Sequence, residues 1–159
     1  MRISVFGLGY VGCVSAACLS QNGHEVLGLD ISPQKVGLIS SGRAPVIEPG
    51  LDSLVRQAVQ SGATRVTSDS EGAVRDSDVS MICVGTPSNR NGSLDLQYVE
   101  NVCREIGTKL ADKNGYHVVV IRSTVLPGMP EDRLIPILEE CSSKSAGSDF
   151  GVCSGSTNK

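Results

Sequence analysis

The sequence has few aromatic and few basic side chains. It contains no Trp, three Tyr and two Phe among 159 residues, and its formal net charge is −3. Proteins that bind nucleic acids carry a basic patch, and those that bind single strands also present aromatic side chains on which bases stack. This composition provides neither, and we expect no nucleic-acid partner.

The sequence also lacks the residue spacings that are typical of metal ions and catalytic nucleophiles. Its six cysteines form no CxxC pair, and His24 and His117 belong to no HExxH motif. We predict no metal site and cysteines that stay reduced and mostly buried, as in a cytoplasmic protein. We expect both histidines to precede strands and to be structural or solvent-facing.

No segment predicts a membrane span. The uncharged residues 3–19 follow Arg2 and imitate a secretory signal, but three glycines interrupt them and they fall short of the ~20 apolar residues that a spanning helix needs. We therefore expect a cytoplasmic protein. A chain of this length buries one core, which predicts a single domain.

Apolar runs alternate with stretches of helical periodicity, which predicts an α/β fold: a doubly wound, mostly parallel six-stranded sheet of the Rossmann type, with strands one and four adjacent. This domain would span residues 1–154, followed by a polar tail at 155–159. Pro136 should bend or split the last helix. The strands are predicted at 3–6, 25–29, 65–67, 79–84, 118–121 and 150–153, and the helices at 11–21, between Pro33 and Gly42, between Gly50 and Gly62, at 96–110 and at 130–140.

The stretch GLGYVG directly follows the first strand and opens the first helix, which is the context that a dinucleotide-binding glycine turn requires. In this interpretation Gly7 permits the tight turn, Gly9 lets a diphosphate approach the backbone, and Gly12 lets the helix pack close to the sheet. The diphosphate would meet free N–H groups at the positive end of the helix dipole.

Asp30 ends the second strand, at the distance from the glycines where an acidic residue holds the ribose hydroxyls. Its charge would repel the additional phosphate of NADP, so we predict NAD, although Ser32 and Lys35 keep NADP open as a lesser alternative. Lys35 lies in the first turn of a helix, where a cation opposes the dipole unless a bound anion or Asp30 compensates. A solvated surface lysine is the other interpretation.

Two further hydroxyl groups follow strands at the edge where ligands bind in this topology. Thr86 follows the fourth strand and is a candidate cofactor contact, or an ordinary turn residue. Thr124 follows the fifth strand and could position a substrate or a water, an auxiliary role, but it cannot act as a base for hydride transfer at neutral pH. Its alternative role is a helix cap.

Five motifs occur in one order along the chain: FGLGYVG, GHEVLGLD, PVIEPGL, ICVGTPS and RSTVLPG. Together they resemble the UDP-glucose/GDP-mannose dehydrogenase family of nucleotide-sugar 6-dehydrogenases, and the similarity runs from Met1 to about Ser154. The stretches CVGTPSNRNGSLDL, VCREIG and RSTVLPG are most similar to the members that act on GDP-mannose and supply GDP-mannuronate for alginate.

The resemblance implies an NAD-dependent oxidation of the sugar's primary alcohol to the acid, with two NAD reduced per sugar. In the family a cysteine captures the aldehyde as a thiohemiacetal, and the second hydride transfer leaves a thioester that water cleaves. The resemblance also implies a homo-oligomeric full-length enzyme. It places the cofactor contacts on Tyr10, Val11, Asp30, Lys35, Thr86 and Thr124.

Members of the family continue after this domain with an NPEF-like segment, a central helix and a sugar-nucleotide domain that carries the nucleophilic cysteine. This sequence does not contain these regions. Cys153 lies in VCSGSTNK, which is not the family's cysteine motif. We therefore expect an NAD-binding domain that does not turn over a sugar nucleotide by itself. The alternatives are the same domain of a UDP-glucose 6-dehydrogenase, a related hydroxyacid dehydrogenase, and a free-standing, non-catalytic NAD-binding module.

Overall fold

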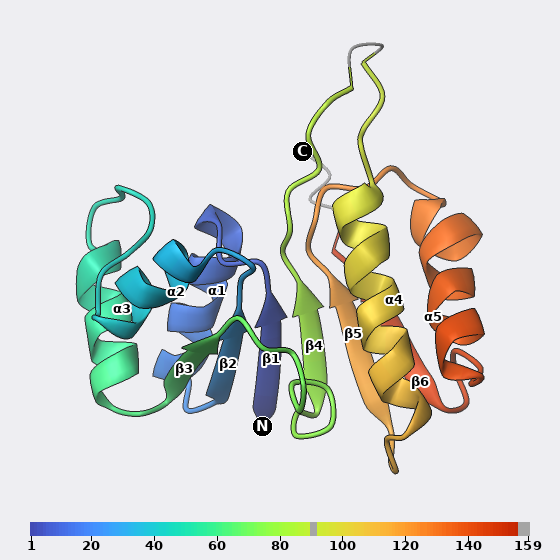
Figure 1. Ribbon diagram of the computed structural model, residues 1–159, viewed down its shortest axis with the longest axis horizontal. Helices are drawn as coiled ribbons and strands as arrows, with labels where there is room; N and C mark the ends of the chain where they lie inside the picture. Colours follow the sequence, from blue (N-terminus) through green and yellow to red (C-terminus); the bar gives the residue numbers. More distant parts are fainter. Residues whose placement is uncertain (90–91, 156–159) are drawn as a thin grey trace.

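The computed structural model describes residues 1–89 and 92–155, and its centre is one parallel sheet. The strands lie in the order β3-β2-β1-β4-β5-β6, which confirms the doubly wound topology and the adjacency of the first and fourth strands (Figure 1). Of the predicted tail, residues 156–159 lie outside the described residues. The strands are β1 Arg2–Phe6, β2 Glu25–Leu29, β3 Thr64–Thr67, β4 Val79–Ile82, β5 His117–Ile121 and β6 Phe150–Ser154.

The helices cover both faces of this sheet. Neighbouring residues of β1 point to opposite faces: Val5 packs into a core with α1, α2 and α3, whereas Phe6 packs into a core with α4 and α5. Both strand faces are therefore apolar, as a buried parallel sheet requires. The helices are α1 Tyr10–Gln21, α2 Pro33–Ser40, α3 Leu51–Gln60, α4 Gln97–Ala111, the π-helical turn η1 Pro130–Leu134 and α5 Ile135–Ser142.

The predicted helix at 130–140 is split, as Pro136 suggested. Residues Pro130–Leu134 form a π-helical turn, and the α-helical register begins at Ile135. Pro136 then occupies the first turn of α5, where its missing N–H needs no acceptor. The proline thus starts a new helix instead of interrupting an old one.

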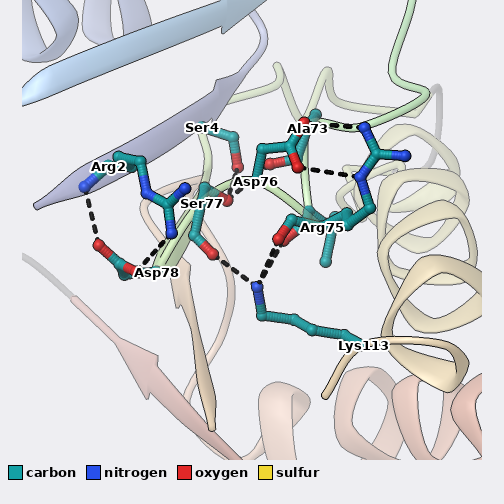
Figure 2. Close-up of polar contacts among 9 residues, drawn as sticks. Arg2, Ser4, Ala73, Arg75, Asp76, Ser77, Asp78 and Lys113 are labelled. Carbon is teal, nitrogen blue, oxygen red and sulfur yellow. Dashed lines mark hydrogen bonds and ion pairs between the residues drawn. The ribbon is translucent and has the colours of Figure 1, made fainter. Parts of the chain in front are cut away.

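The connection between β3 and β4 contains no helix: residues 68–78 form turns. Ala73 and Val74 are buried in the core on the α4 side. The ammonium of Lys113, which follows α4, donates to the carbonyls of Val74, Arg75 and Ser77 at 2.9, 3.0 and 2.8 Å (Figure 2). One lysine therefore holds this irregular segment against the sheet.

Buried polar side chains cross the sheet at the amino-terminal ends of its strands. Ser4 of β1 shares a hydrogen bond of 2.8 Å with Ser80 of β4, and Ser80 shares one of 2.9 Å with Nε2 of His117 on β5. Ser77 extends this chain through Ser4 at 3.2 Å. His117 is therefore structural, but it belongs to its strand and is fully buried rather than preceding the strand.

Burial, helped by the nearby charge of Lys113, lowers the pKa of His117 to about 4, against an ordinary value of about 6.5. The folded protein therefore keeps this imidazole neutral in a pH range where the unfolded chain protonates it. Folding stability is complete above pH ~6.5 and decreases as the pH falls towards 4.

We predict that His117→Asn reduces the dependence of stability on pH in this window. A single such histidine gives a slope of up to ~1.4 kcal/mol per pH unit, which the variant lacks. Urea unfolding at several pH values between 4 and 7 measures the slope, with His117→Gln as a second variant. An unchanged slope in both folded variants contradicts the assignment.

Candidate functional site

The glycine turn after β1 has the geometry that the sequence predicts. Gly7 has φ +94°, a conformation that L side chains rarely adopt, and its N–H donates to the carbonyl of Leu29 at 2.8 Å. A Cβ added at Gly12 would lie 1.8 Å from the carbonyl oxygen of Gly7, so only glycine lets α1 start this close to the turn. A Cβ at Gly9 would meet no atom within 4 Å. Gly12 therefore serves packing, and Gly9 borders open space.

The first turn of α1 has no capping group of its own. Its N-cap residue is Gly9, no side chain accepts a hydrogen bond there, and the turn contains no acidic residue. The amides of Tyr10, Val11 and Gly12 precede the first possible intrahelical bond, so they have no helical acceptor. These amides and the positive end of the helix dipole favour an anion beside Gly9.

The carboxylate of Asp30 joins three segments. Oδ2 accepts from the amide of Leu8 at 2.9 Å and from Nζ of Lys35 at 3.1 Å, and Oδ1 accepts from the amide of Ser32 at 2.9 Å. Its side chain is 6% exposed. A carboxylate has about four acceptor positions, so one on Oδ1 remains for a ligand hydroxyl.

Burial alone would raise the pKa of Asp30, but the hydrogen bonds from Ser32, Leu8 and Lys35 together outweigh it and hold that pKa below its ordinary value. The stabilisation is present above about pH 4 and is lost as the pH falls through the lower folded value. The contact with Asp30 also compensates Lys35 for its place in the first turn of α2, where Ser32 is the N-cap. Lys35 therefore forms a specific ion pair with Asp30 and is not merely a solvated surface lysine.

A cleft of about 600 Å³ opens beside these groups at the carboxyl ends of the strands. Four of the predicted site residues line it: Gly7, Gly9, Asp30 and Lys35. The side chains of Tyr10 and Val11 are 52% and 40% exposed and lie outside its lining, as does Gly12. Their backbone amides lie in the first turn of α1, next to Gly9. The further residues around the cleft are Phe6, Leu29, Ile31, Ser68, Ser70, Cys83, Val84, Gly85, Pro87, Tyr98, Asn101, Val102 and Glu105.

The two predicted threonines do not line this cleft. After β4 the chain leaves the sheet as a hairpin (Figure 1), in which the amide of Asp95 donates to the carbonyl of Pro87 at 2.8 Å. Half-buried Thr86 directly precedes Pro87. After β5 it is Ser123 that turns inward and donates to the carbonyl of Val84 at 2.7 Å. Thr124, the next residue, is exposed.

The alternative role of Thr124 as a helix cap is wrong. The next helical segment begins at Pro130, and Met129 occupies its N-cap position. Thr124 therefore belongs to an exposed loop at the edge where the cleft opens.

One face of α4 forms a side of the cleft that was not predicted. Tyr98, Asn101, Val102 and Glu105 are spaced i, i+3, i+4 and i+7, so they share one stripe of the helix. The sequence contained this signal as a second stripe beside the buried residues Val99, Cys103, Ile106 and Leu110. We did not predict this second stripe, because the apolar stripe alone is enough to explain why α4 packs on the sheet.

The cysteines do not form a reactive centre in the described part of the chain. All six are free, but only Cys13, Cys83 and Cys103 are buried, and Cys18 and Cys153 are exposed, so the expectation of mostly buried thiols was wrong for these two. Burial raises the pKa of Cys83, which lines the cleft, to about 12 and keeps it protonated at neutral pH.

Two other findings concern the described residues alone. No three of their His, Cys, Asp or Glu side chains gather so that they could hold a metal ion. None of their helices is both long and apolar enough to cross a membrane.

The cleft described above offers an anion position beside Gly9, the carboxylate of Asp30 for a hydroxyl, and a partly apolar wall. Together these groups suit a nucleotide.

Residues 1–156 match the NAD binding domain of the UDP-glucose/GDP-mannose dehydrogenase family. The chain is 58% identical over 152 residues to the GDP-mannose 6-dehydrogenase of Pseudomonas putida, an alignment that covers 96% of this chain and 35% of that protein. It is 44% identical over 133 residues to the UDP-glucose 6-dehydrogenase of Rhizobium meliloti, covering 83% and 30%.

Solved structures agree with this match. The crystal structure of a ternary complex of GDP-mannose dehydrogenase from Pseudomonas aeruginosa superposes with a TM-score of 0.95 at 57% identity, covering 97% of this chain and 35% of that one. The chain therefore spans about a third of the length of the curated relatives that it matches.

We predict that Gly12→Ala lowers the free energy of unfolding by at least ~3 kcal/mol, because the new Cβ meets backbone that cannot move aside. Gly9→Ala is the matched control in the same turn: it meets open space and should change stability by less than ~1 kcal/mol. Urea unfolding of both variants measures the difference. Equal stabilities would show that α1 does not pack against the turn as described.

Proposed function

This chain belongs to the UDP-glucose/GDP-mannose dehydrogenase family, as an NAD-binding domain, and we propose that it is the cofactor domain of a GDP-mannose 6-dehydrogenase. The observation that supports this choice is the identity of 58% to a GDP-mannose enzyme against 44% to a UDP-glucose enzyme, over a larger part of the chain. The whole protein would be an oxidoreductase of the cytoplasm.

The described residues fit NAD. The open space at Gly9 and the uncapped amides of α1 would hold the diphosphate, and Asp30, with its remaining acceptor position, would bind a hydroxyl of the adenosine ribose. Bound NAD supplies the hydride acceptor for oxidation of an alcohol. The polypeptide binds and orients it, and Lys35 keeps Asp30 charged and in place.

Thr86 and Thr124 remain proposed contacts for the other end of the cofactor. Both follow strands at the edge where the cleft opens, on the loops after β4 and β5. Ser123 ties these two loops together through the carbonyl of Val84, so the loops keep a fixed relation. A threonine hydroxyl by itself does not act as a base for hydride transfer at neutral pH, and we assign Thr124 only an auxiliary role in orienting a ligand.

For the whole protein we propose oxidation of GDP-mannose to GDP-mannuronate with two NAD, a precursor step for alginate, carried out by a homo-oligomer. The nucleophilic cysteine of that reaction is not assigned to any residue of this chain. Domain 1–154 would supply the cofactor site, and the sugar nucleotide would bind to parts that this chain does not contain. The UDP-glucose reaction is the second candidate, supported by the 44% identity.

We predict that the chain binds NAD at least ~10-fold more tightly than NADP, because the carboxylate of Asp30 repels the additional phosphate. Asp30→Asn should weaken NAD binding and narrow this preference, since the amide is neutral and has one acceptor fewer. Calorimetric titration with both dinucleotides measures the ratio. The exposed Asp112 provides the control variant Asp112→Asn, which should behave as the wild type. A preference that is unchanged in Asp30→Asn contradicts the role of Asp30.

Gly9→Ala should leave the fold intact but weaken NAD binding at least ~10-fold, because a methyl group then occupies the position of the diphosphate. The same titration, together with a thermal melt, separates this effect from unfolding. Full NAD affinity in a folded Gly9→Ala variant would place the diphosphate elsewhere.

We further predict that the purified chain forms no NADH from GDP-mannose and NAD, since binding of the cofactor alone does not provide the nucleophile. Absorbance of NADH during incubation with GDP-mannose or UDP-glucose measures this, and a full-length GDP-mannose 6-dehydrogenase is the positive control. Steady NADH formation by the chain alone would overturn the assignment as a cofactor domain without turnover.

A further inference from the structure

The cleft continues beyond Asp30, away from the glycine turn. Ile31, which is 90% exposed, lines this cleft together with Asp30, with Ser68 and Ser70 of the helix-free connection, and with the stripe of α4. In a dinucleotide whose diphosphate lies at Gly9 and whose ribose lies at Asp30, the next group in this direction is the adenine base. Within this lining, the stripe of α4 is the part that combines aliphatic and aromatic atoms with an amide and a carboxylate.

This stripe is apolar in part and polar in part. Ile31 and Val102 offer aliphatic atoms, and Tyr98 offers an aromatic ring that is half exposed; such groups pack against the flat faces of a purine. Asn101 and Glu105 are four residues apart, one turn of the helix, so they are neighbours on the same stripe. These two residues carry the polar groups that can reach the edge of the base.

The amide of Asn101 has a defined orientation. Its Oδ1 accepts a hydrogen bond of 3.0 Å from Nη1 of Arg104, which leaves the Nδ2 group as a donor. Arg104 also binds Glu100 at 3.3 Å, and Glu100 binds Arg133 at 2.6 Å, so Arg104 is itself held in place. Asn101 therefore presents N–H groups to a ligand.

Glu105 supplies the opposite polarity. It is half-buried and lines the cleft, and within the part of the chain that the structure describes its carboxylate has no hydrogen-bond or ion-pair partner. A carboxylate accepts and does not donate. Asn101 and Glu105 thus form a donor and an acceptor side by side on one wall.

We propose that Asn101 and Glu105 read the edge of the adenine base and make the chain selective for adenine over hypoxanthine dinucleotides. Adenine presents an amino donor next to a ring-nitrogen acceptor, which complements the carboxylate of Glu105 and the amide donor of Asn101. Hypoxanthine presents a carbonyl oxygen in place of the amino group, and this oxygen faces the carboxylate as a second acceptor. The inference rests on the NAD binding proposed above and adds a specificity determinant to it.

The test compares NAD with nicotinamide hypoxanthine dinucleotide, which differs from NAD only at the base. In calorimetric titrations the wild-type chain should bind NAD at least ~10-fold more tightly, which corresponds to the loss of one hydrogen bond to a charged group. Glu105→Gln should reduce the preference to less than ~3-fold, because a Gln amide can turn and present either its oxygen or its N–H group. Glu140→Gln, an exposed residue of α5 outside the cleft, is the control and should keep the wild-type ratio.

The outcomes separate this inference from the function on which it rests. The proposal that Asn101 and Glu105 recognise the base is overturned if the wild type binds both dinucleotides equally. It is also overturned if a Glu105→Gln variant that melts at the wild-type temperature keeps the wild-type ratio. Neither result contradicts NAD binding. Failure of the wild type to bind either dinucleotide overturns the proposed function, and the inference with it. A ratio that falls in Glu105→Gln and persists in Glu140→Gln supports the proposal.

Discussion

The carboxylate of Asp30 fixes the geometry on which the cleft depends. By accepting from Leu8, Ser32 and Lys35 it joins the glycine turn after β1 to the start of α2, in addition to the backbone bond from Gly7 to Leu29. The turn and the carboxylate that we propose as the ribose ligand are thus positioned by one another. A residue that would contact the cofactor is at the same time a structural joint, and its hydrogen bonds to three neighbours explain why its side chain is only 6% exposed.

Around this joint the fold leaves backbone groups and space unfilled at the carboxyl edge of the sheet. The first turn of α1 has no cap, Gly9 borders open space, and the connection from β3 to β4 lacks the helix that would cover the neighbouring part of the sheet. Some polar side chains of the interior are paired across strands, as in the chain from Ser4 through Ser80 to His117, although Nδ1 of His117 has no hydrogen-bond partner among the described residues. The uncapped first turn of α1, the open space at Gly9 and the cleft coincide at the carboxyl edge of the sheet.

Much of this arrangement could be predicted from the sequence because it is encoded locally. The order of the strands follows from their alternation with helices, and the roles of Gly7, Gly12 and Asp30 follow from fixed spacings within one strand–helix–strand unit. Thr86 and Thr124 were predicted as cofactor contacts from their place after strands, and both remain predictions, since Thr86 lies next to a hairpin and Thr124 next to the inward-turned Ser123, outside the lining of the cleft. The stripe of α4 and the buried state of His117 depend on which distant segments pack against them, and spacing along the chain does not report that.

The helix-free connection from Ser68 to Asp78 has a consequence for how this domain can vary. Lengthening a surface loop costs little in chain entropy, about 0.6 kcal/mol for each doubling, so folding alone would tolerate a longer insertion here. Lys113 holds the segment at its far end, near Val74 to Ser77, and Ser68 and Ser70 form the rim of the cleft at its near end. If the adenine base binds where we propose, a longer insertion at Ser68 and Ser70 would encroach on its position. Under that proposal the ligand, and not folding, limits the length of this loop.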